Sequence, residues 1–217
     1  MPARPQSSKD AARQASQEWI DGFLFLGNHL ALDFLNTKLV LPDGPKELLP
    51  DTDALVRWLI ASGLLASQKQ KNLARKWSGA PKAEAFVKEL LAFRERLRAE
   101  VVRREKGLPV SHAFAAELNS LLEQHPSVVA LRRNGENLER EIVFEPVSPD
   151  DVWAPIAMAV AELLSDVPAR RVRQCESCIV HYYDTSRKGS RRWCSMNICG
   201  NKIKVAAYQR RNRAAQE

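Results

Sequence analysis

The chain has 217 residues, of which 45% are hydrophobic and 27% are charged, as in an ordinary soluble globular protein. A chain of this length can form one large domain or two small ones and can bury a true core. It contains no apolar run of membrane-spanning length, and its first residues lack the apolar core of a signal peptide. We therefore expect no membrane association and a cytoplasmic location, where thiols stay reduced.

The formal net charge of +7 is distributed unevenly along the chain. Residues 170–217 contain twelve Lys and Arg against three acidic residues, whereas residues 1–169 contain 21 basic and 23 acidic residues. The basic excess therefore belongs to the C-terminal segment. Such an asymmetry is typical of a surface that binds a polyanion, and a solvated basic tail is the alternative.

The N-terminal part begins with residues 1–17, whose Pro, Ser and charge content predicts a flexible tail. Residues 27–37 are apolar nearly all round, which predicts a short buried helix. Asp33 and Asn36 lie three residues apart on one face of that helix. Because a buried carboxylate needs a partner, both residues are candidates for a polar site.

Helix signals continue over residues 54–62, 67–77, 81–106 and 111–124, whereas residues 39–50 are expected to form Pro-centred turns. In the longest helix, Arg94 falls inside the apolar arc. Either the aliphatic part of the Arg94 side chain lies along the apolar surface and its guanidinium reaches solvent, or the guanidinium is buried and pairs with a carboxylate such as Asp33. The apolar stripe that defines this arc consists of Phe86, Leu90, Phe93, Leu97 and Val101.

Two β-prone runs, 128–133 and 138–144, flank Asn134-Gly135 and predict a hairpin. A final helix is expected from Ser148 to Ser165, before Pro168 breaks the pattern. The predicted fold is therefore mainly α with a small β-hairpin. We expect a helical domain over residues 18–168 and a small module over residues 169–217.

All four cysteines of the chain lie in the C-terminal module, at Cys175, Cys178, Cys194 and Cys199. Two close pairs joined by a short loop can surround one tetrahedral Zn²⁺, and four thiolates leave no open coordination position. The pattern therefore predicts one structural zinc ion. Two disulfides, a redox-active dithiol and an iron site are the alternatives.

Short strands over residues 170–174 and 180–184, a polar loop and a helix over residues 197–213 predict a treble-clef-like zinc finger. We expect His181 to pack in the hairpin rather than to bind metal. Basic and amide side chains of the loop and helix are candidates for phosphate and base contacts. These candidates are Arg187, Lys188, Arg191, Arg192, Asn201, Lys202, Lys204, Arg210 and Arg211.

The cysteine module resembles the bacterial CGNR zinc finger in Cys175-x2-Cys178, Asp184-Thr185-Ser186 and the run 191–202, RRWCSMNICGNK. Lys202 stands at the fourth position of the CGNR signature, where the family usually has Arg. It keeps the positive charge but lacks the planar guanidinium that can form two parallel hydrogen bonds. The run 30–37, LALDFLNT, together with Trp58, Arg94-Glu95 and Trp153, resembles the companion ABATE domain. The resemblance implies a stress-responsive transcription regulator with a DNA-binding finger and a sensor domain. It also marks Asp33, Asn36 and Arg94 as candidates for a ligand pocket.

These patterns predict a regulator in which the helical domain binds a small ligand, such as an anion held by Arg94, while the finger binds DNA. A homodimer is compatible with this arrangement. RNA or the ribosome is the alternative target for the same basic finger. A protein-interaction module with an acidic partner is a further alternative. An enzyme with its pocket at Asp33, Asn36 and Arg94 is disfavoured, because the sequence shows no nucleophile–base pair, phosphate loop or open metal site.

Overall fold

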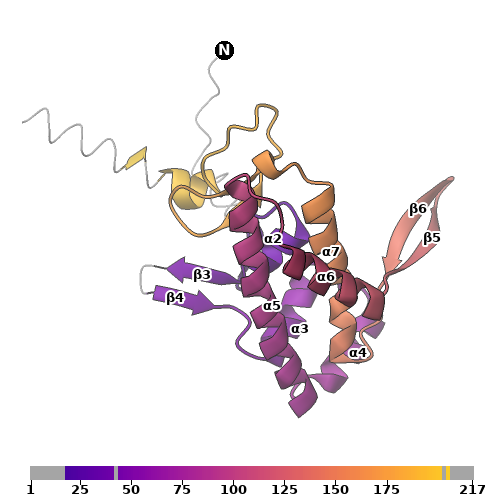
Figure 1. Ribbon diagram of the computed structural model, residues 1–217. Helices are drawn as coiled ribbons and strands as arrows, with labels where there is room; N and C mark the ends of the chain where they lie inside the picture. Colours follow the sequence, from indigo (N-terminus) through magenta and orange to yellow (C-terminus); the bar gives the residue numbers. More distant parts are fainter. Residues whose placement is uncertain (1–17, 42–43, 202–203, 206–217) are drawn as a thin grey trace, which may run out of the picture.

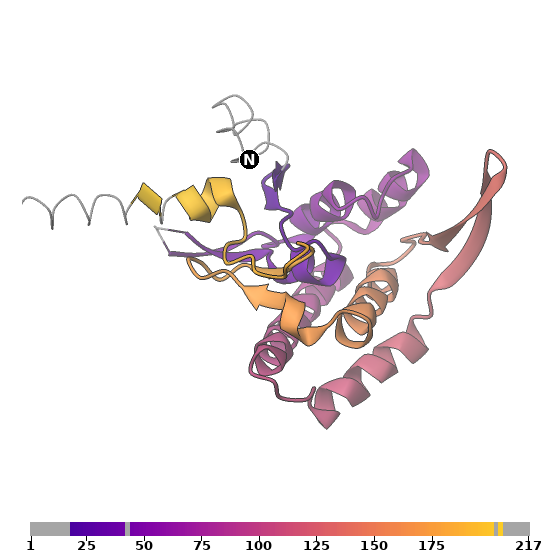
Figure 2. The ribbon, with the colours of Figure 1, turned by 90° about the horizontal axis from the view of Figure 1, so that it is seen from above.

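The computed structural model describes residues 18–41, 44–201 and 204–205, and its described part is mainly α-helical (Figures 1 and 2). The predicted tail, residues 1–17, lies outside the described residues. The helices begin and end within a few residues of the predicted bounds. They are α2 (Leu30–Leu35), α3 (Thr52–Ala61), α4 (Gln68–Trp77), α5 (Pro81–Glu105), α6 (His112–Gln124) and α7 (Trp153–Ser165).

The strands of the described residues form four separate two-stranded antiparallel pairs. They are β1 (Trp19–Ile20) with β2 (Phe23–Leu24), β3 (Lys38–Leu41) with β4 (Gly44–Glu47), β5 (Val128–Asn134) with β6 (Asn137–Val143), and β7 (Val172–Gln174) with β8 (His181–Tyr183). The predicted β5–β6 hairpin is confirmed, and Figure 1 shows it projecting away from the helices. The expectation of simple turns over residues 39–50 was wrong, because residues on both sides of the tip pair as strands β3 and β4.

Helix α5 organises the core of the N-terminal part. It starts with Pro81 at its first turn, where a missing N–H costs nothing, and Gly107 with φ of 74° follows its end. Its apolar stripe is buried as predicted. Phe93 stacks on Phe114 at 5.5 Å between ring centroids and meets the edge of Trp153 at 5.1 Å. These aromatic contacts hold α6 and α7 against α5.

Helix α2 is enclosed, because Ala31, Leu32, Phe34 and Leu35 are all fully buried. It packs against α5 and α7 and also against β8 of the cysteine module. Gly27 precedes it in a position with no room for a side chain: an added Cβ would lie 2.7 Å from the Cβ of Leu32. The short apolar helix therefore joins the helical part to the cysteine module.

The cysteine module shares the buried apolar cluster of the helical part. Val172, Tyr182 and Cys194 belong to the same cluster as the side chains of α2 and α5. The 3₁₀ turn η2 (Ala169–Arg171) follows α7 and leads into β7. The division into residues 18–168 and 169–217 stays a prediction, and the contacts across it are extensive.

Candidate metal centre and its contacts with the helical part

The four cysteines gather at one point although eighteen residues lie between Cys175 and Cys194. Their Sγ atoms all lie within 4.8 Å of one another. Cys194 Sγ lies 3.7 Å from Cys178 Sγ and 3.6 Å from Cys199 Sγ. In a tetrahedral site with Zn–S bonds of about 2.3 Å, neighbouring sulfur atoms are about 3.8 Å apart. The thiols are free of disulfide bonds and have the spacing that one metal ion requires.

Local backbone structure places each pair of thiols. Cys175 follows β7, and its N–H donates to Val180 O at 2.8 Å, which closes the first turn between β7 and β8. Ser195 begins the π-helical turn η3 (Met196–Gly200), and its side chain accepts from Asn197 N and Ile198 N. This cap orients the turn that carries Cys199. The remainder of the helix predicted over residues 197–213 lies mostly outside the described residues.

Asp184 fixes the loop between the two cysteine pairs. Its buried carboxylate accepts hydrogen bonds from the N–H of Ser186 and of Arg191, each at 2.9 Å. Burial opposes ionisation, but the hydrogen bonds hold the pKa of Asp184 below its ordinary value. Sequence reasoning treated Asp184 only as part of a motif. Its place in Asp-Thr-Ser before a basic loop was the available signal for this anchoring role.

The predicted nucleic-acid residues differ in their surroundings. Arg187, Lys188, Asn201 and Lys204 are exposed. Arg192 is also exposed, but it forms an ion pair with Glu176 at 2.6 Å and covers the ring of Trp193. Lys202, Arg210 and Arg211 lie outside the residues whose side chains are described.

Arg191 is turned toward the interior of the module. Its guanidinium lies 4.3 Å from the ring centre of Tyr182 and donates to the carbonyl oxygens of Trp193 and Cys194. Tyr182 Oη in turn donates to Arg191 O at 2.7 Å. These contacts brace the backbone at the second cysteine pair, a role that exposed Arg187 and Lys188 do not share.

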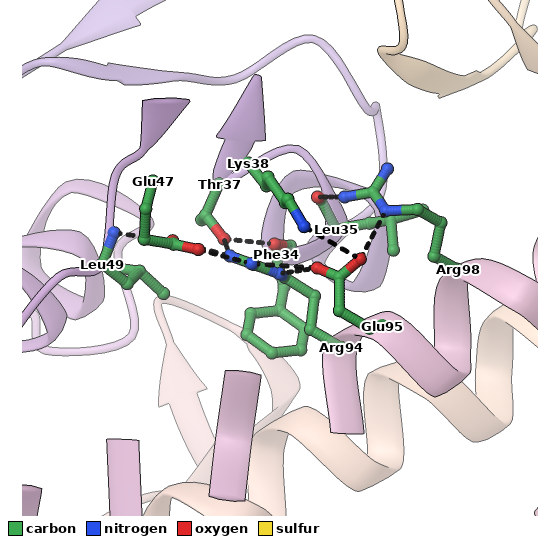
Figure 3. Close-up of polar contacts among 9 residues, drawn as sticks. All are labelled: Phe34, Leu35, Thr37, Lys38, Glu47, Leu49, Arg94, Glu95 and Arg98. Atoms are coloured by element: carbon green, nitrogen blue, oxygen red, sulfur yellow. Dashed lines mark hydrogen bonds and ion pairs between the residues drawn. The ribbon is translucent and has the colours of Figure 1, made fainter. Parts of the chain in front are cut away.

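Arg94 is a buried ion-pair residue of the helical part, and Figure 3 shows its contacts. Only 1% of it is exposed. Its two terminal nitrogens donate to the two carboxylate oxygens of Glu47 at 2.8 and 2.6 Å. The other donors reach Thr37 Oγ1 and Glu95 Oε1, so all five guanidinium N–H groups have partners. Of the two alternatives for Arg94, pairing with a carboxylate is confirmed, but the partner is Glu47 on β4 and not Asp33, the example that the sequence suggested.

Asp33 and Asn36 have separate partners. Asp33 Oδ1 accepts from Gly27 N at 2.7 Å, and burial raises the pKa of Asp33 to about 6. The side-chain amide of Asn36 donates to His181 O at 2.8 Å and accepts from His181 N at 2.9 Å. It therefore makes the two hydrogen bonds with β8 that the backbone of a neighbouring strand would make. The structure therefore does not bring Asp33, Asn36 and Arg94 together around one ligand. Their assignment as a ligand site stays a prediction.

Two further residues, Gly27 and Asn28, join the segment before α2 to β8, and the sequence analysis identified neither contact. Asn28 Nδ2 donates to Tyr183 O at 3.0 Å, and Tyr183 N donates to Gly27 O at 2.8 Å. His181 is buried, and its Nε2 lies 3.6 Å from Glu105 Oε2 of α5. The prediction that His181 packs in the hairpin agrees with this position. We call Gly27, Asn28 and Asn36, with β8, the latch.

The partly buried carboxyl of Asp33 leads to a prediction about pH. Its pKa in the folded protein, about 6, is above its ordinary value of 3.8, so the folded state holds the proton more tightly. The resulting stabilisation is complete below pH 3.8 and is lost as pH rises through 6. Asp33→Asn keeps an acceptor for Gly27 N without a charge. We expect its advantage over the wild type in unfolding free energy to grow by about 2 kcal/mol between pH 4 and pH 7.

Urea unfolding of both proteins across this pH range measures that difference. Effects of pH on the cysteines act on both proteins and cancel in the comparison. A difference that stays constant from pH 4 to pH 7 would show that Asp33 titrates as an ordinary surface carboxyl.

Two family models match the chain. The ABATE model, described as "Putative stress-induced transcription regulator", matches residues 28–167, and the CGNR zinc finger model matches residues 171–212. No curated protein matches the chain. Within the described residues, no helix is both long and apolar enough to cross a membrane. The second match spans all four clustered thiols, which identifies their metal as zinc. The chain therefore belongs to the ABATE family, and a CGNR zinc finger with a four-cysteine structural zinc site follows its ABATE domain.

Proposed function

We propose that the protein is a DNA-binding transcription regulator whose zinc finger contacts the phosphates of duplex DNA. The supporting observation is the loop between the two cysteine pairs, which carries exposed Arg187 and Lys188 and is anchored by buried Asp184. A fixed loop presents these cations at a constant distance from the zinc cluster. Phosphate contacts of this kind provide affinity, and base-edge contacts provide specificity.

The other basic residues contribute in different ways. Arg192 reaches a phosphate after leaving Glu176, so Glu176 competes with DNA for the same guanidinium. Asn201 and Lys204, exposed after η3, extend the basic surface toward the C-terminus. Lys202, Arg210 and Arg211 join this surface on the sequence pattern alone. Arg191 supports the loop from within rather than contacting DNA.

The ABATE domain acts as the sensor of the regulator. The latch places backbone and amide groups of α2 against β8, so a change in the position of α2 alters the placement of the finger. The projecting β5–β6 hairpin exposes Val129, Leu131 and Leu138 at 50 to 68%. We assign this hairpin to contact with a second copy of the chain in a homodimer.

The test is binding of the purified protein to duplex DNA, including its own promoter region, over a salt series. Arg187→Ala/Lys188→Ala removes the two exposed loop cations. Arg75→Ala/Lys76→Ala is the matched control, since it removes an equally exposed Arg-Lys pair from α4. We expect the loop variant to bind about tenfold or more weakly, with a log–log salt slope shallower by about 2, and the α4 variant to bind normally.

Equal salt slopes for the loop variant and the wild type would contradict the proposed interface. A folded, zinc-loaded protein that ignores duplex DNA but binds structured RNA tightly would identify RNA as the target instead. The zinc content of the same protein sample is measured as well, so that a loss of DNA binding can be distinguished from a loss of zinc.

A further inference from the structure

A cavity of about 470 Å³ opens in the ABATE domain between the start of α2, the α3–α4 connection, the end of β6 and α7. This volume falls within the range of small-molecule sites. Most of its lining is apolar and includes Leu64, Phe144 and Met158. Its remaining polar groups come mainly from His29, Gln70 and Glu162. None of Asp33, Asn36 and Arg94 lines this cavity.

The polar groups of the cavity differ in whether they are free to bind a ligand. The Gln70 amide is occupied, since it donates to Phe144 O at 2.7 Å and accepts from Ser67 N at 2.8 Å. The Glu162 carboxylate is partly buried and has no hydrogen bond or ion pair among the described residues. The described lining contains no Lys or Arg. The carboxylate of Glu162 is therefore the free charged group at this cavity.

His29 lies at the same cavity and is neutral at physiological pH. Burial lowers the pKa of His29 from its ordinary value, although the charge of Glu162 opposes this shift. Its Nδ1 accepts from Ala31 N at 3.3 Å, which caps α2. In the neutral ring the proton is then on Nε2, which can donate a hydrogen bond. His29 therefore adds no positive charge that would attract an anion.

We propose that this cavity binds a small protonated amine with an apolar body, the ammonium group against Glu162 and the body against Leu64, Phe144 and Met158. An ammonium group gives the partly buried carboxylate the partner it lacks. The ring of Phe144 adds an apolar, π-electron surface suited to a cationic ligand. The anion expected from the sequence has no comparable site at Arg94, because every donor of that guanidinium is occupied.

The position of the cavity relates the ligand to the latch, and this part of the inference rests on the proposed function. His29 caps the N-terminus of α2, and the two residues before it, Gly27 and Asn28, bind Tyr183 of the finger. Asn36 at the other end of α2 binds His181. An amine whose ammonium group pairs with Glu162 on α7 and whose apolar body packs beside His29, the N-cap of α2, favours one position of α2 over others. It thereby changes the affinity of the finger for DNA.

The probe is 2-phenylethylamine, compared with neutral 2-phenylethanol and anionic 3-phenylpropionate, which have similar apolar bodies. Binding to the full-length zinc-loaded protein is measured by calorimetry. Glu162→Gln keeps the shape of the side chain and removes its charge, and Met158→Trp fills the cavity. Glu123→Gln, at an exposed position of α6, is the matched control. Circular dichroism establishes that each variant is folded.

We expect the amine to bind at one site per chain and with a higher affinity than the alcohol or the anion. Glu162→Gln should weaken amine binding by about tenfold or more, Met158→Trp should abolish it, and Glu123→Gln should leave it unchanged. Absence of amine binding, a preference for the anion, or an amine affinity unaffected by Glu162→Gln would each overturn the site.

The DNA titration separates this inference from the proposed function. If the protein binds DNA but not the amine, the regulator stands and the amine site fails. If it binds the amine through Glu162 but never binds DNA, the site stands and the regulator fails. If it binds both without any effect of one on the other, the latch does not couple them.

Discussion

Removal of zinc is expected to unfold the finger over residues 171–200 while the helices of the ABATE domain stay folded. The described part of the finger has two three-residue strands and one helical turn, and few of its apolar side chains are buried. So small a module cannot maintain its structure by apolar burial alone. Structural zinc contributes about 10 kcal/mol or more to the folding of such units. Without the ion, the described part of the module would have only Val172, Val180 and Tyr182 as buried apolar side chains besides the cysteines.

Hydrogen exchange with and without a chelator measures this effect segment by segment. Protection should disappear at β7 and β8 and persist in α5, whose Phe93 and Trp153 packing does not involve the finger. Cys199→Ser should reproduce the loss and also abolish DNA binding. Ser177→Ala, at an exposed position between the first two cysteines, should not. Retained protection of β7 and β8 after complete zinc removal would show that the metal is not structural.

Arg94→Met is expected to destabilise the protein by about 3 kcal/mol, because it leaves the Glu47 carboxylate and Thr37 without their donor. The matched control is Arg96→Met in the same helix. Arg96 forms an equally close pair with Glu117, but 48% of its side chain is exposed, against 2% for Arg94. The control should therefore cost less than about 1 kcal/mol.

Urea unfolding monitored by circular dichroism provides both values. Adding Glu47→Gln to Arg94→Met should recover part of the loss, since it removes the carboxylate left without a partner. If Arg94→Met is as stable as the wild type, the ion pair does not hold β4 against α5. Arg94 would then return as a candidate ligand residue.

The zinc site shows how much a local pattern can determine. The spacing of Cys175, Cys178, Cys194 and Cys199 predicted one closed metal site, and the four thiols meet within 4.8 Å. Backbone turns of a few residues decide whether two thiols can share an ion, so the sequence contains most of the necessary information. The helices were predictable for a similar reason, since apolar periodicity and end signals act within a few turns.

The partners of single polar residues were not predictable in this way. Arg94 was recognised as an unusual charge on an apolar face, but its partner Glu47 is 47 residues earlier in a hairpin interpreted as turns. Arg191 looked like its loop neighbours Arg187 and Lys188, yet it faces Tyr182. At both positions the sequence is compatible with an arginine that is exposed on the surface and with one that is paired in the interior. The surrounding segments decide between them.

The sequence by itself therefore determined the helical class, the zinc ligands, the charge asymmetry and the family resemblance. Only the tertiary structure decided that Asn36 holds the finger, that Arg94 is fully paired, and that a cavity with a free carboxylate opens beside His29. The physical reason is the range of the interactions. Caps, periodicity and metal-ligand spacing are short-range, whereas ion pairs, interfaces and cavities depend on segments that meet only after the chain has folded.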